Sequence, residues 1–249
     1  LGLDPGDMYA ISRLLLDKEY KIDGITTVHR LLERSARDHS AMKSSEIANK
    51  LIHYTKMVDV PVLPGAERMF FPGENINYSV PAVDFIISTA KSLDKKEKLT
   101  IFCLGPLTNV ALALEKEPSI ASKLILYFSG AIYDNKARIW NKNEFNVKND
   151  LDAFDLILNN TEVELNIMPF NVSLNLVFSV EEFQDLRSQN HDFSNLLDEV
   201  YHSMDLGEKL NAEELAVIEV YLNQDFGNLK NVVTPPENKQ KSIKVYSSI

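Results

Sequence analysis

The stretch LTIFCLGPLTNVALALE, residues 99–115, decides the fold class of this chain. Leu99–Leu104 is a short apolar run, and after a Gly-Pro turn the apolar residues recur at helical spacing over Asn109–Glu115. A strand that passes directly into a helix is the unit of a parallel sheet with crossover helices. The same alternation recurs along the chain. Further strands are predicted at Ile22–Val28, Val60–Leu63, Leu124–Phe128 and Val163–Met168, and further helices at Asp7–Leu16, Pro81–Leu93, Asp150–Leu158 and Glu213–Leu222.

This order of elements predicts an α/β fold of the Rossmann type, a doubly wound, mostly parallel sheet flanked by helices. The near-continuous apolar character of the strands indicates burial on both faces of the sheet. We expect a single domain over residues 1–249, less regular from about residue 175. Ser179–Gln184 opens with a capping-box pattern. The tail beyond Asn223 is polar and contains prolines, so we expect it to be loose at its end.

The composition excludes several classes of function. The formal net charge is −10 and no basic stripe offsets it, so a nucleic-acid partner is not expected. No stretch reaches the ~20 apolar residues of a membrane helix, so no membrane partner is expected. The only cysteine, Cys103, rules out an internal disulfide and is compatible with a reducing compartment such as the cytoplasm. The sequence also has no dinucleotide-binding, P-loop or nucleophile-elbow motif.

Three polar clusters stand where strands are predicted to end or helices to begin. The first is LGLDPGDM, residues 1–8, which runs straight into a predicted helix. Its carboxylates, Asp4 and Asp7, suit a hard cation such as calcium, which takes several oxygen ligands at once. The alternative is structural: Asp4 caps the helix and Asp7 interacts with its positive N-terminal end.

The second cluster, Gly105–Asn109, follows the strand at Leu99–Leu104. A backbone carbonyl at the strand end suits a metal site, and the sequence predicts that Thr108 or Asn109 caps the next helix. The third cluster is Glu144-Phe145-Asn146, with Asp150 at the start of a helix shortly after. In an extended segment Glu144 and Asn146 point the same way, as a pair that binds sugar hydroxyls would. An ordinary polar strand edge is the alternative.

Together these segments resemble the inosine-uridine preferring nucleoside hydrolase family. The matching pieces follow the family order over roughly residues 1–175. They are Gly24–Val28, Val60–Glu67, Ala82–Ile86, Gly105–Leu114 and Glu144–Asn146.

The resemblance implies hydrolysis of an N-glycosidic bond with a tightly bound calcium ion, and a homo-oligomer, either a dimer or a tetramer. In the family an Asp-rich N-terminal loop supplies calcium ligands, a ribose contact and the general base. We align Asp4 with the acid after the family glycine and Gly6 and Asp7 with the closing acid pair. The family's general base then falls before Leu1. A second register, which would put Met8 and Tyr9 at the acid pair, spoils the spacing to Thr26-Thr27.

The other family positions carry over unevenly. The resemblance makes the Leu104 carbonyl and Glu213 calcium ligands beside Asp7, and it gives ribose contacts to Glu144, Asn146, Phe128 and Asp150. Leu31 stands where the family has a ribose-binding Asn, and Ala212-Glu213 where it has a His-Asp pair. Ala cannot relay a proton, and the longer Glu moves its carboxylate outward.

Two functions follow from this reading of the sequence. The first is an active calcium-dependent hydrolase of nucleosides or related N-ribosides, with Asp4 and Asp7 at the catalytic centre. The second is a non-catalytic sugar-binding or ligand-binding domain on the same scaffold.

Overall fold

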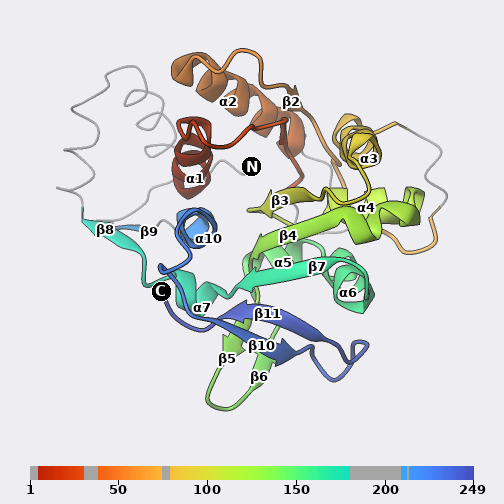
Figure 1. Cartoon of the computed structure of the whole chain (residues 1–249), viewed down its shortest axis with the longest axis vertical. Coiled ribbons are helices and arrows are strands. Elements are labelled where there is room, and N and C mark those ends of the chain that lie inside the picture. The colour runs from red at the N-terminus through yellow and green to blue at the C-terminus, as the bar shows by residue number, and fades with distance from the viewer. Residues whose placement is uncertain (1–4, 31–38, 75–78, 180–208, 212) are drawn as a thin grey trace.

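The computed structural model describes residues 5–30, 39–74, 79–179, 209–211 and 213–249 (Figure 1). Its centre is a five-stranded sheet with the order β10-β11-β7-β4-β3. The strands β3, β4, β7 and β11 run parallel to one another. β10 pairs with β11 in the antiparallel direction, at the edge of the sheet opposite β3. The strands are β3 (Leu99–Cys103), β4 (Leu124–Ser129), β7 (Glu164–Met168), β10 (Leu229–Val233) and β11 (Ser242–Tyr246).

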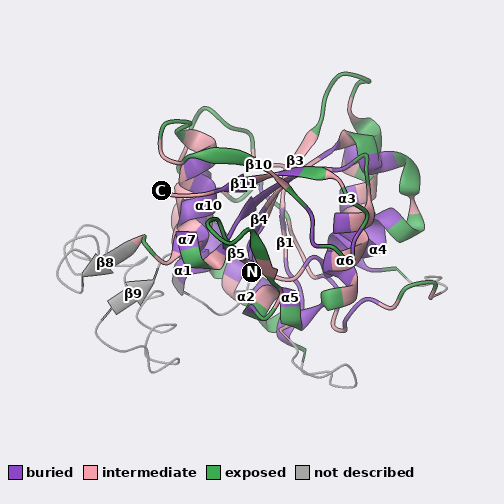
Figure 2. Cartoon of the chain, turned by 90° about the horizontal axis from the view of Figure 1, so that it is seen from below, coloured by how far each residue is buried: buried purple, intermediate pink, exposed green. Residues whose placement is uncertain are grey.

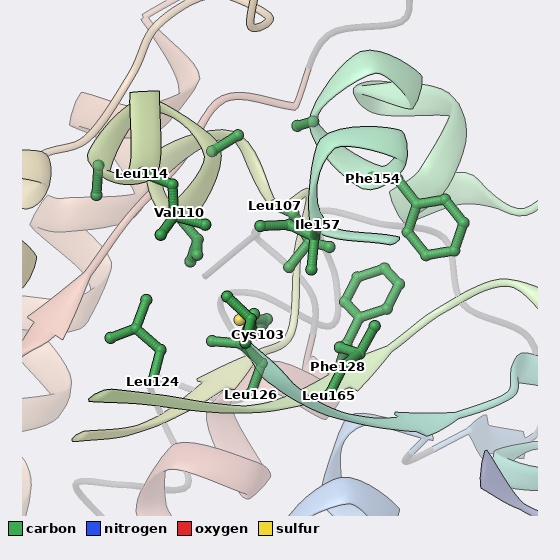
Figure 3. Close-up of a cluster of buried hydrophobic side chains, with 14 of the residues drawn as sticks. Cys103, Leu107, Val110, Leu114, Leu124, Leu126, Phe128, Phe154, Ile157 and Leu165 are labelled. Carbon is green, nitrogen blue, oxygen red and sulfur yellow. The ribbon is translucent and has the colours of Figure 1, made fainter. Parts of the chain in front are cut away.

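Side chains alternate between the two faces of this sheet, and helices cover both faces. In β4, Leu126 and Phe128 belong to one apolar cluster, whereas the intervening Tyr127 packs against another. The first cluster lies under the helices α3, α4 and α6, and Figure 3 shows part of it. The second lies under α1, α7 and α10. These helices are α1 (Pro5–Leu15), α3 (Pro81–Ser92), α4 (Thr108–Lys116), α6 (Leu151–Asn159), α7 (Phe170–Ser173) and α10 (Glu213–Leu222).

The predicted doubly wound α/β architecture is therefore confirmed. Burial on both faces holds best for the inner strands β4 and β7. Figure 2 shows that buried residues, in purple, gather in the interior between the helices. In β3, residues 99–102 are only partly buried, because this strand forms an edge of the five-stranded sheet. No described helix has the length and apolarity needed to cross a bilayer.

A second, smaller parallel sheet pairs β1 (Ile25–Thr26) with β2 (Val62–Leu63). Both strands are shorter than the sequence predicted. The helix between them, α2 (Ser40–Thr55), was not predicted, because much of its buried face consists of Ser and Ala. α1, α2 and β1 share a third apolar cluster, which includes Met8, Leu51 and Ile25.

The C-terminal part contains the largest departure from the sequence predictions. The tail beyond Asn223 is not loose: β10 and β11 form a hairpin, and β11 joins the central sheet beside β7. Two further hairpins pair β5 (Ile132–Asp134) with β6 (Ile139–Asn141) and β8 (Val177–Ser179) with β9 (Lys209–Asn211). Ser179 ends β8, and the rest of the predicted capping box lies outside the described residues.

Two short helical segments complete the described structure. The 3-10 helix Pro118–Lys123 follows α4 and leads into β4, and α5 (Phe145–Asn149) precedes α6. The Glu144-Phe145-Asn146 segment was predicted to be extended, and this prediction is wrong. Glu144 is the N-cap of α5, and its side chain accepts hydrogen bonds from the backbone N–H groups of Asn146 and Val147.

Candidate active site

Asn146 fixes the first turn of α5 against the carboxyl ends of two neighbouring strands. Its Nδ2 donates hydrogen bonds to the Leu104 carbonyl at 3.1 Å and to the Ser129 carbonyl at 2.9 Å. Leu104 directly follows β3, and Ser129 ends β4. Ligands of open α/β sheets bind at this edge, where the loops after the strands converge.

Glu144 is held at the same edge by backbone donors. Its Oε2 accepts from the N–H groups of Ala131 (3.1 Å) and Val147 (3.2 Å), and its Oε1 accepts from Asn146 N–H (2.9 Å). The residue is buried. A substitution at Gly130 would disturb it, because an added Cβ would lie 3.0 Å from Glu144 Oε2 and closer still to the Phe128 ring.

The hydrogen-bond inventory shows what these two side chains still offer to a ligand. An amide NH₂ has two donors, and both of those on Asn146 are used by backbone carbonyls, which leaves Oδ1 as an acceptor. A carboxylate has about four acceptor sites, of which Glu144 uses three on backbone N–H groups. The remaining acceptor capacity suits hydroxyl donors, such as those of a sugar.

Asp150 lies at the centre of a buried network behind this segment. Its Oδ2 accepts from Thr108 Oγ1 at 2.6 Å and from Phe70 N–H at 2.7 Å, and its Oδ1 caps α6 through Ala153 N–H. Because Thr108 Oγ1 donates to Asp150, it accepts at 2.8 Å from His29 Nε2, which must then carry the proton. These hydrogen bonds give Asp150 a structural role. Its predicted contact with ribose stays a prediction.

Thr108 and Asn109 were predicted to cap α4, and this is wrong, because the N-cap Leu107 has no side-chain cap and neither residue caps the helix. Asn109 instead joins two loops: its Nδ2 donates to the Thr27 carbonyl at 2.8 Å, and its Oδ1 accepts from Ala66 N–H at 2.9 Å. Gly65 permits this approach, since an added Cβ would lie 1.9 Å from the Thr27 carbonyl oxygen.

Asp7 lies in the first turn of α1, and its side chain is only 3% exposed. The next residue, Met8, points into the apolar cluster around Leu51 and Ile25. One turn further along α1, Ala10 packs in the same cluster as Leu104 and Met168, which follow or end β3 and β7. Asp7 is therefore a buried carboxylate on a helix that packs in the same apolar cluster as Leu104. Asp4 lies outside the described residues.

Glu213 begins α10, which packs beside α1 (Figure 1). Arg13 Nε pairs with Glu219 at 3.0 Å, and the Tyr20 and Tyr221 rings lie 5.3 Å apart, so the C-terminal ends of both helices meet. Burial acts to lower the pKa of Arg13, but the carboxylates of Asp17 and Glu219 more than offset it and raise that pKa.

Asp7 and Glu213 have equivalent places in the sequences of these two helices. Asp7 precedes Arg13 by six residues, and Glu213 precedes Glu219 by six residues. Asp7 and Glu213 thus stand in the first turns of two helices that pack against each other. Ala212 lies outside the described residues, as does Leu31.

Phe128 belongs to the apolar core beneath this edge. Its ring is 1% exposed and packs against Phe154, with 5.6 Å between ring centroids (Figure 3). The edge of the ring still lies near Glu144, because a Cβ added at Gly130 would be 2.4 Å from Phe128 Cζ and 3.0 Å from Glu144 Oε2. The predicted sugar contact of Phe128 stays a prediction.

The sequence reasoning missed a cation beside this segment. Arg30 lies after β1, and its guanidinium carbon stacks over the Phe145 ring at 5.1 Å from the centroid. Cation–π contacts of this kind hold an arginine at a protein surface. The sequence did contain a signal for Arg30: like His29, it directly follows the predicted strand Ile22–Val28.

The three predicted metal ligands, Asp7, Glu213 and the Leu104 carbonyl, all offer oxygen, which is the donor atom that a hard cation takes. The Leu104 carbonyl accepts from Asn146 and has a second lone pair. Within the described part of the chain, no group of three or more His, Cys, Asp or Glu side chains is arranged to hold a metal ion.

Comparison with known proteins agrees with this architecture. The family model of the inosine-uridine preferring nucleoside hydrolases matches residues 1–225, so the chain belongs to this family. Among curated relatives, an uncharacterized protein of Schizosaccharomyces pombe is 27% identical over 198 residues, which cover 70% of this chain and 61% of the relative. Uridine nucleosidase 1 of Arabidopsis thaliana is 27% identical over 233 residues, covering 80% of this chain and 64% of the relative.

The chain thus spans a little over three fifths of the length of these two relatives. Among solved structures, the inosine-uridine preferring nucleoside hydrolase of Bacillus anthracis superposes with a TM-score of 0.71 at 15% identity. That match covers all of this chain and 92% of the other, and it establishes the common fold.

Proposed function

We propose that this protein hydrolyses the N-glycosidic bond of a ribonucleoside or a related N-riboside, with calcium assisting the attack of water at C1 of ribose. The observation that carries the proposal is the hydrogen bond from Asn146 Nδ2 to the Leu104 carbonyl. It holds a sugar-binding segment against a candidate metal ligand at the ligand-binding edge of the sheet. Membership of the nucleoside hydrolase family supports the same reaction class.

The reaction sets an electrostatic requirement that the acidic residues meet. As the bond from C1 to the base nitrogen breaks, its electron pair leaves with the base and positive charge builds on the sugar ring. Carboxylates near the ring stabilise that charge. Water adds its oxygen to C1 and loses a proton to a carboxylate base, and the departing nucleobase gains a proton from solvent. In this proposal Asp4 and Asp7 supply the catalytic carboxylates, and Asp7 is the one whose buried position is described.

Glu144 and Asn146 hold the ribose in this proposal. Their backbone hydrogen bonds fix both side chains before substrate arrives, so little conformational entropy is lost on binding. Phe128 and Asp150 are the further ribose contacts that we propose. Asp150 is fixed by Thr108 and Phe70 N–H, so it also stiffens the loop behind the sugar.

The proposed metal is calcium, held by Asp7, the Leu104 carbonyl and Glu213. When bound, such an ion orients the sugar diol and lowers the pKa of a coordinated water. Calcium takes 6–8 oxygen ligands, so further oxygens, those of water among them, would complete the set. We also propose that the protein is a homo-oligomer, a dimer or a tetramer, which sedimentation velocity tests directly.

The test of function is release of free ribose. The protein is incubated with inosine or uridine and calcium chloride, and reducing sugar is measured against time. We expect release of ribose and free base in equal amounts, and its loss in Asp7→Asn. Absence of release from every ribonucleoside tried would overturn the hydrolase proposal.

One observation favours the second candidate, a non-catalytic sugar-binding domain. Glu144 and Asn146 use most of their hydrogen-bonding capacity on the backbone, which is compatible with a mainly structural role. Calorimetry distinguishes the two: a binding domain gives heat with ribose or nucleoside and no product, whereas the hydrolase gives product.

A further inference from the structure

Arg30 and the short helix α5 are held together at both ends of that helix. At its start, the guanidinium carbon of Arg30 lies over the Phe145 ring, 5.1 Å from the centroid. At its end, Asp150 accepts from Thr108 Oγ1, which also hydrogen-bonds to Nε2 of His29, the neighbour of Arg30. Two separate contacts therefore fix the position of Arg30 beside α5.

The backbone around Arg30 is fixed as well. His29 N–H donates to the Ala66 carbonyl at 2.9 Å, and Arg30 N–H donates to Ser40 Oγ at 2.8 Å. These bonds tie the loop after β1 to the loop after β2 and to the start of α2. The main chain therefore places the arginine side chain at a defined point among the loops that follow the strands.

The guanidinium of Arg30 keeps its hydrogen-bond donors for a ligand. An aromatic ring attracts the positive charge and leaves the five N–H groups for conventional acceptors. Arg13 and Arg68 each pair with a carboxylate, whereas Arg30 forms no ion pair within the part of the chain that the structure describes. Arg30 therefore offers these donors to an anion.

The carboxylates around Arg30 and α5 are engaged with other donors. Glu144 accepts from three backbone N–H groups, and Asp150 accepts from two more and from a hydroxyl. Glu67 accepts from two backbone N–H groups at the start of α2. None of these three carboxylates forms an ion pair with Arg30, so its charge is not neutralised by direct contact with them.

Lys148 adds a second cation on the same short helix. It follows Phe145 by three residues, a spacing that places two side chains on one face of a helix. Lys148 is exposed and forms no ion pair with a described residue, and Phe145 is 40% exposed. Arg30, Phe145 and Lys148 thus make up a cationic patch with an aromatic centre, in a chain whose formal net charge is −10.

This cationic patch borders the proposed sugar-binding residues. Phe145 stands between Glu144 and Asn146 in the chain, and consecutive Cα atoms are only about 3.8 Å apart. A charged group attached to a sugar at Glu144 and Asn146 would therefore lie close to the patch.

A phosphate group suits the cationic patch best. The planar guanidinium fork binds phosphate through two parallel hydrogen bonds. A phosphate monoester carries a charge of about −1.5 to −2 at neutral pH, which matches two cations better than the single charge of a carboxylate does. In the proposed function the sugar diol faces calcium, so the 5′ position is the one left to carry this group.

We infer that Arg30 and Lys148 form a phosphate-binding subsite, which selects N-ribosides phosphorylated at the 5′ position. The inference rests on the proposed function and names its substrate class, the ribonucleoside 5′-monophosphates. Arg30 contacts the phosphate and not C1 of ribose, so it determines specificity mainly through KM.

Calorimetry with two sugars tests the subsite independently of turnover. Ribose 5-phosphate and ribose are titrated separately into the protein with calcium chloride present. We expect ribose 5-phosphate to bind at least about tenfold more tightly than ribose. This ratio should fall as salt is added, because salt screens the attraction. Equal affinities, or no detectable binding of ribose 5-phosphate, overturn the inference.

Substitutions assign the binding to the cationic patch. Arg30→Met removes the charge and the donors, and we expect it to reduce the ratio of the two affinities below about threefold. Lys148→Met should reduce the ratio by a smaller factor, because an ammonium group binds phosphate as a point charge. Lys96→Met is the matched control and should keep the ratio, since Lys96 is exposed and precedes β3, at the opposite end of the strand from Leu104.

An unchanged ratio in Arg30→Met overturns the inference. If Arg30→Met does not fold by circular dichroism, Lys148→Met decides, and an unchanged ratio in that variant then overturns the inference.

Turnover separates this inference from the proposed function. Initial rates are compared for uridine, uridine 5′-monophosphate and orotidine, whose base carries a carboxylate. We expect KM for the monophosphate to be at least about tenfold below that for uridine. A preference for orotidine over the monophosphate overturns the assignment to phosphate. If no substrate is cleaved, the proposed hydrolysis fails, and the calorimetric comparison still decides on the subsite.

Discussion

The side-chain Nδ2 of Asn146 lies 3.1 Å from the carbonyl oxygen of Leu104, and this hydrogen bond joins the proposed sugar contact to the proposed metal ligand. The same amide reaches Ser129 O at 2.9 Å, so one side chain spans the ends of two parallel strands. A substitution of Asn146 should therefore alter both the position of α5 and the electrostatic field at the Leu104 carbonyl oxygen.

Asn146→Asp is expected to reduce ribose release and stability together. A carboxylate would face two carbonyl oxygens that now accept hydrogen bonds, and each lost buried hydrogen bond costs about 1–3 kcal/mol. The measurements are urea unfolding and the initial rate with inosine. Asn49→Asp is the matched control, because Asn49 Nδ2 also donates to a backbone carbonyl, that of Ser45 in α2, outside the hydrogen bonds of Glu144 and Asn146. Equal loss of activity in both variants would argue against a special role of Asn146.

Thr108→Val is expected to lower the free energy of unfolding by about 1–3 kcal/mol. It leaves Asp150 Oδ2 and His29 Nε2 without their shared buried hydroxyl, while the volume of the side chain hardly changes. Thr108→Ser keeps the hydroxyl and should recover most of that loss. If Ser and Val destabilise equally in urea unfolding, the methyl group and not the hydroxyl network matters.

Asp7→Asn should abolish stabilisation by calcium. If calcium binds only the folded protein, an ion at one hundred times its Kd adds about 2.7 kcal/mol to the free energy of unfolding. We expect Tm to rise with added calcium and to fall with EGTA in the unsubstituted protein, and not in Asp7→Asn. Asp225→Asn, at an exposed position, is the control and should keep the response. If calcium leaves the Tm of the unsubstituted protein unchanged, the proposed set of calcium ligands is contradicted.

Cys103 should resist alkylation in the native protein. Burial raises the pKa of its thiol to about 12, and the thiolate is the reactive form. At pH 8 we expect iodoacetamide to label the folded chain far more slowly than the chain in urea. Mass spectrometry follows the labelling, and equal rates in the two conditions would show that β3 opens readily at this end.

Lys241 should make stability depend on pH above neutrality. Burial lowers its pKa to about 8, below the ordinary value near 10.5, so between these values the unfolded chain binds more protons than the folded chain. Stability therefore rises as the pH increases from about 8 towards 10.5, and this gain is absent below pH 8. The side chain is only half buried, so the gain should be near 1 kcal/mol.

Urea unfolding at pH 7.5 and 9.5 measures this dependence. We expect Lys241→Met to flatten the rise relative to the unsubstituted protein, and Lys239→Met, at an exposed position, to leave it unchanged. The same rise in both variants would assign the pH dependence to other groups.

The parts of the fold that the sequence predicted correctly are those where one signal dominates. Glu213–Leu222 was placed at its observed bounds, because an apolar stretch follows directly after two acidic residues of the first turn. The inner strands β4 and β7 were found because both faces are covered, so most of their side chains are apolar. β10 was missed because it is an edge strand whose residues are mostly exposed, so its composition resembles a loop.

The site residues were less predictable, because their roles depend on contacts between distant segments. Glu144 and Asn146 were selected as a pair, but the pairing was explained by an extended backbone that does not exist. Nothing in the local sequence indicates that Asn146 binds a carbonyl 42 residues away. Thr108 and Asn109 have the composition of helix caps, and tertiary partners use their side chains instead.

The position of β11 has a practical consequence for trimming this protein. The family match ends at residue 225, whereas the hairpin that pairs with β7 runs from Leu229 to Tyr246. A chain shortened at the limit of the match would expose the edge of β7 and the part of the apolar core that Ile243 and Val245 now cover. Such a fragment should aggregate on expression, so the boundary of sequence similarity is the wrong place to cut.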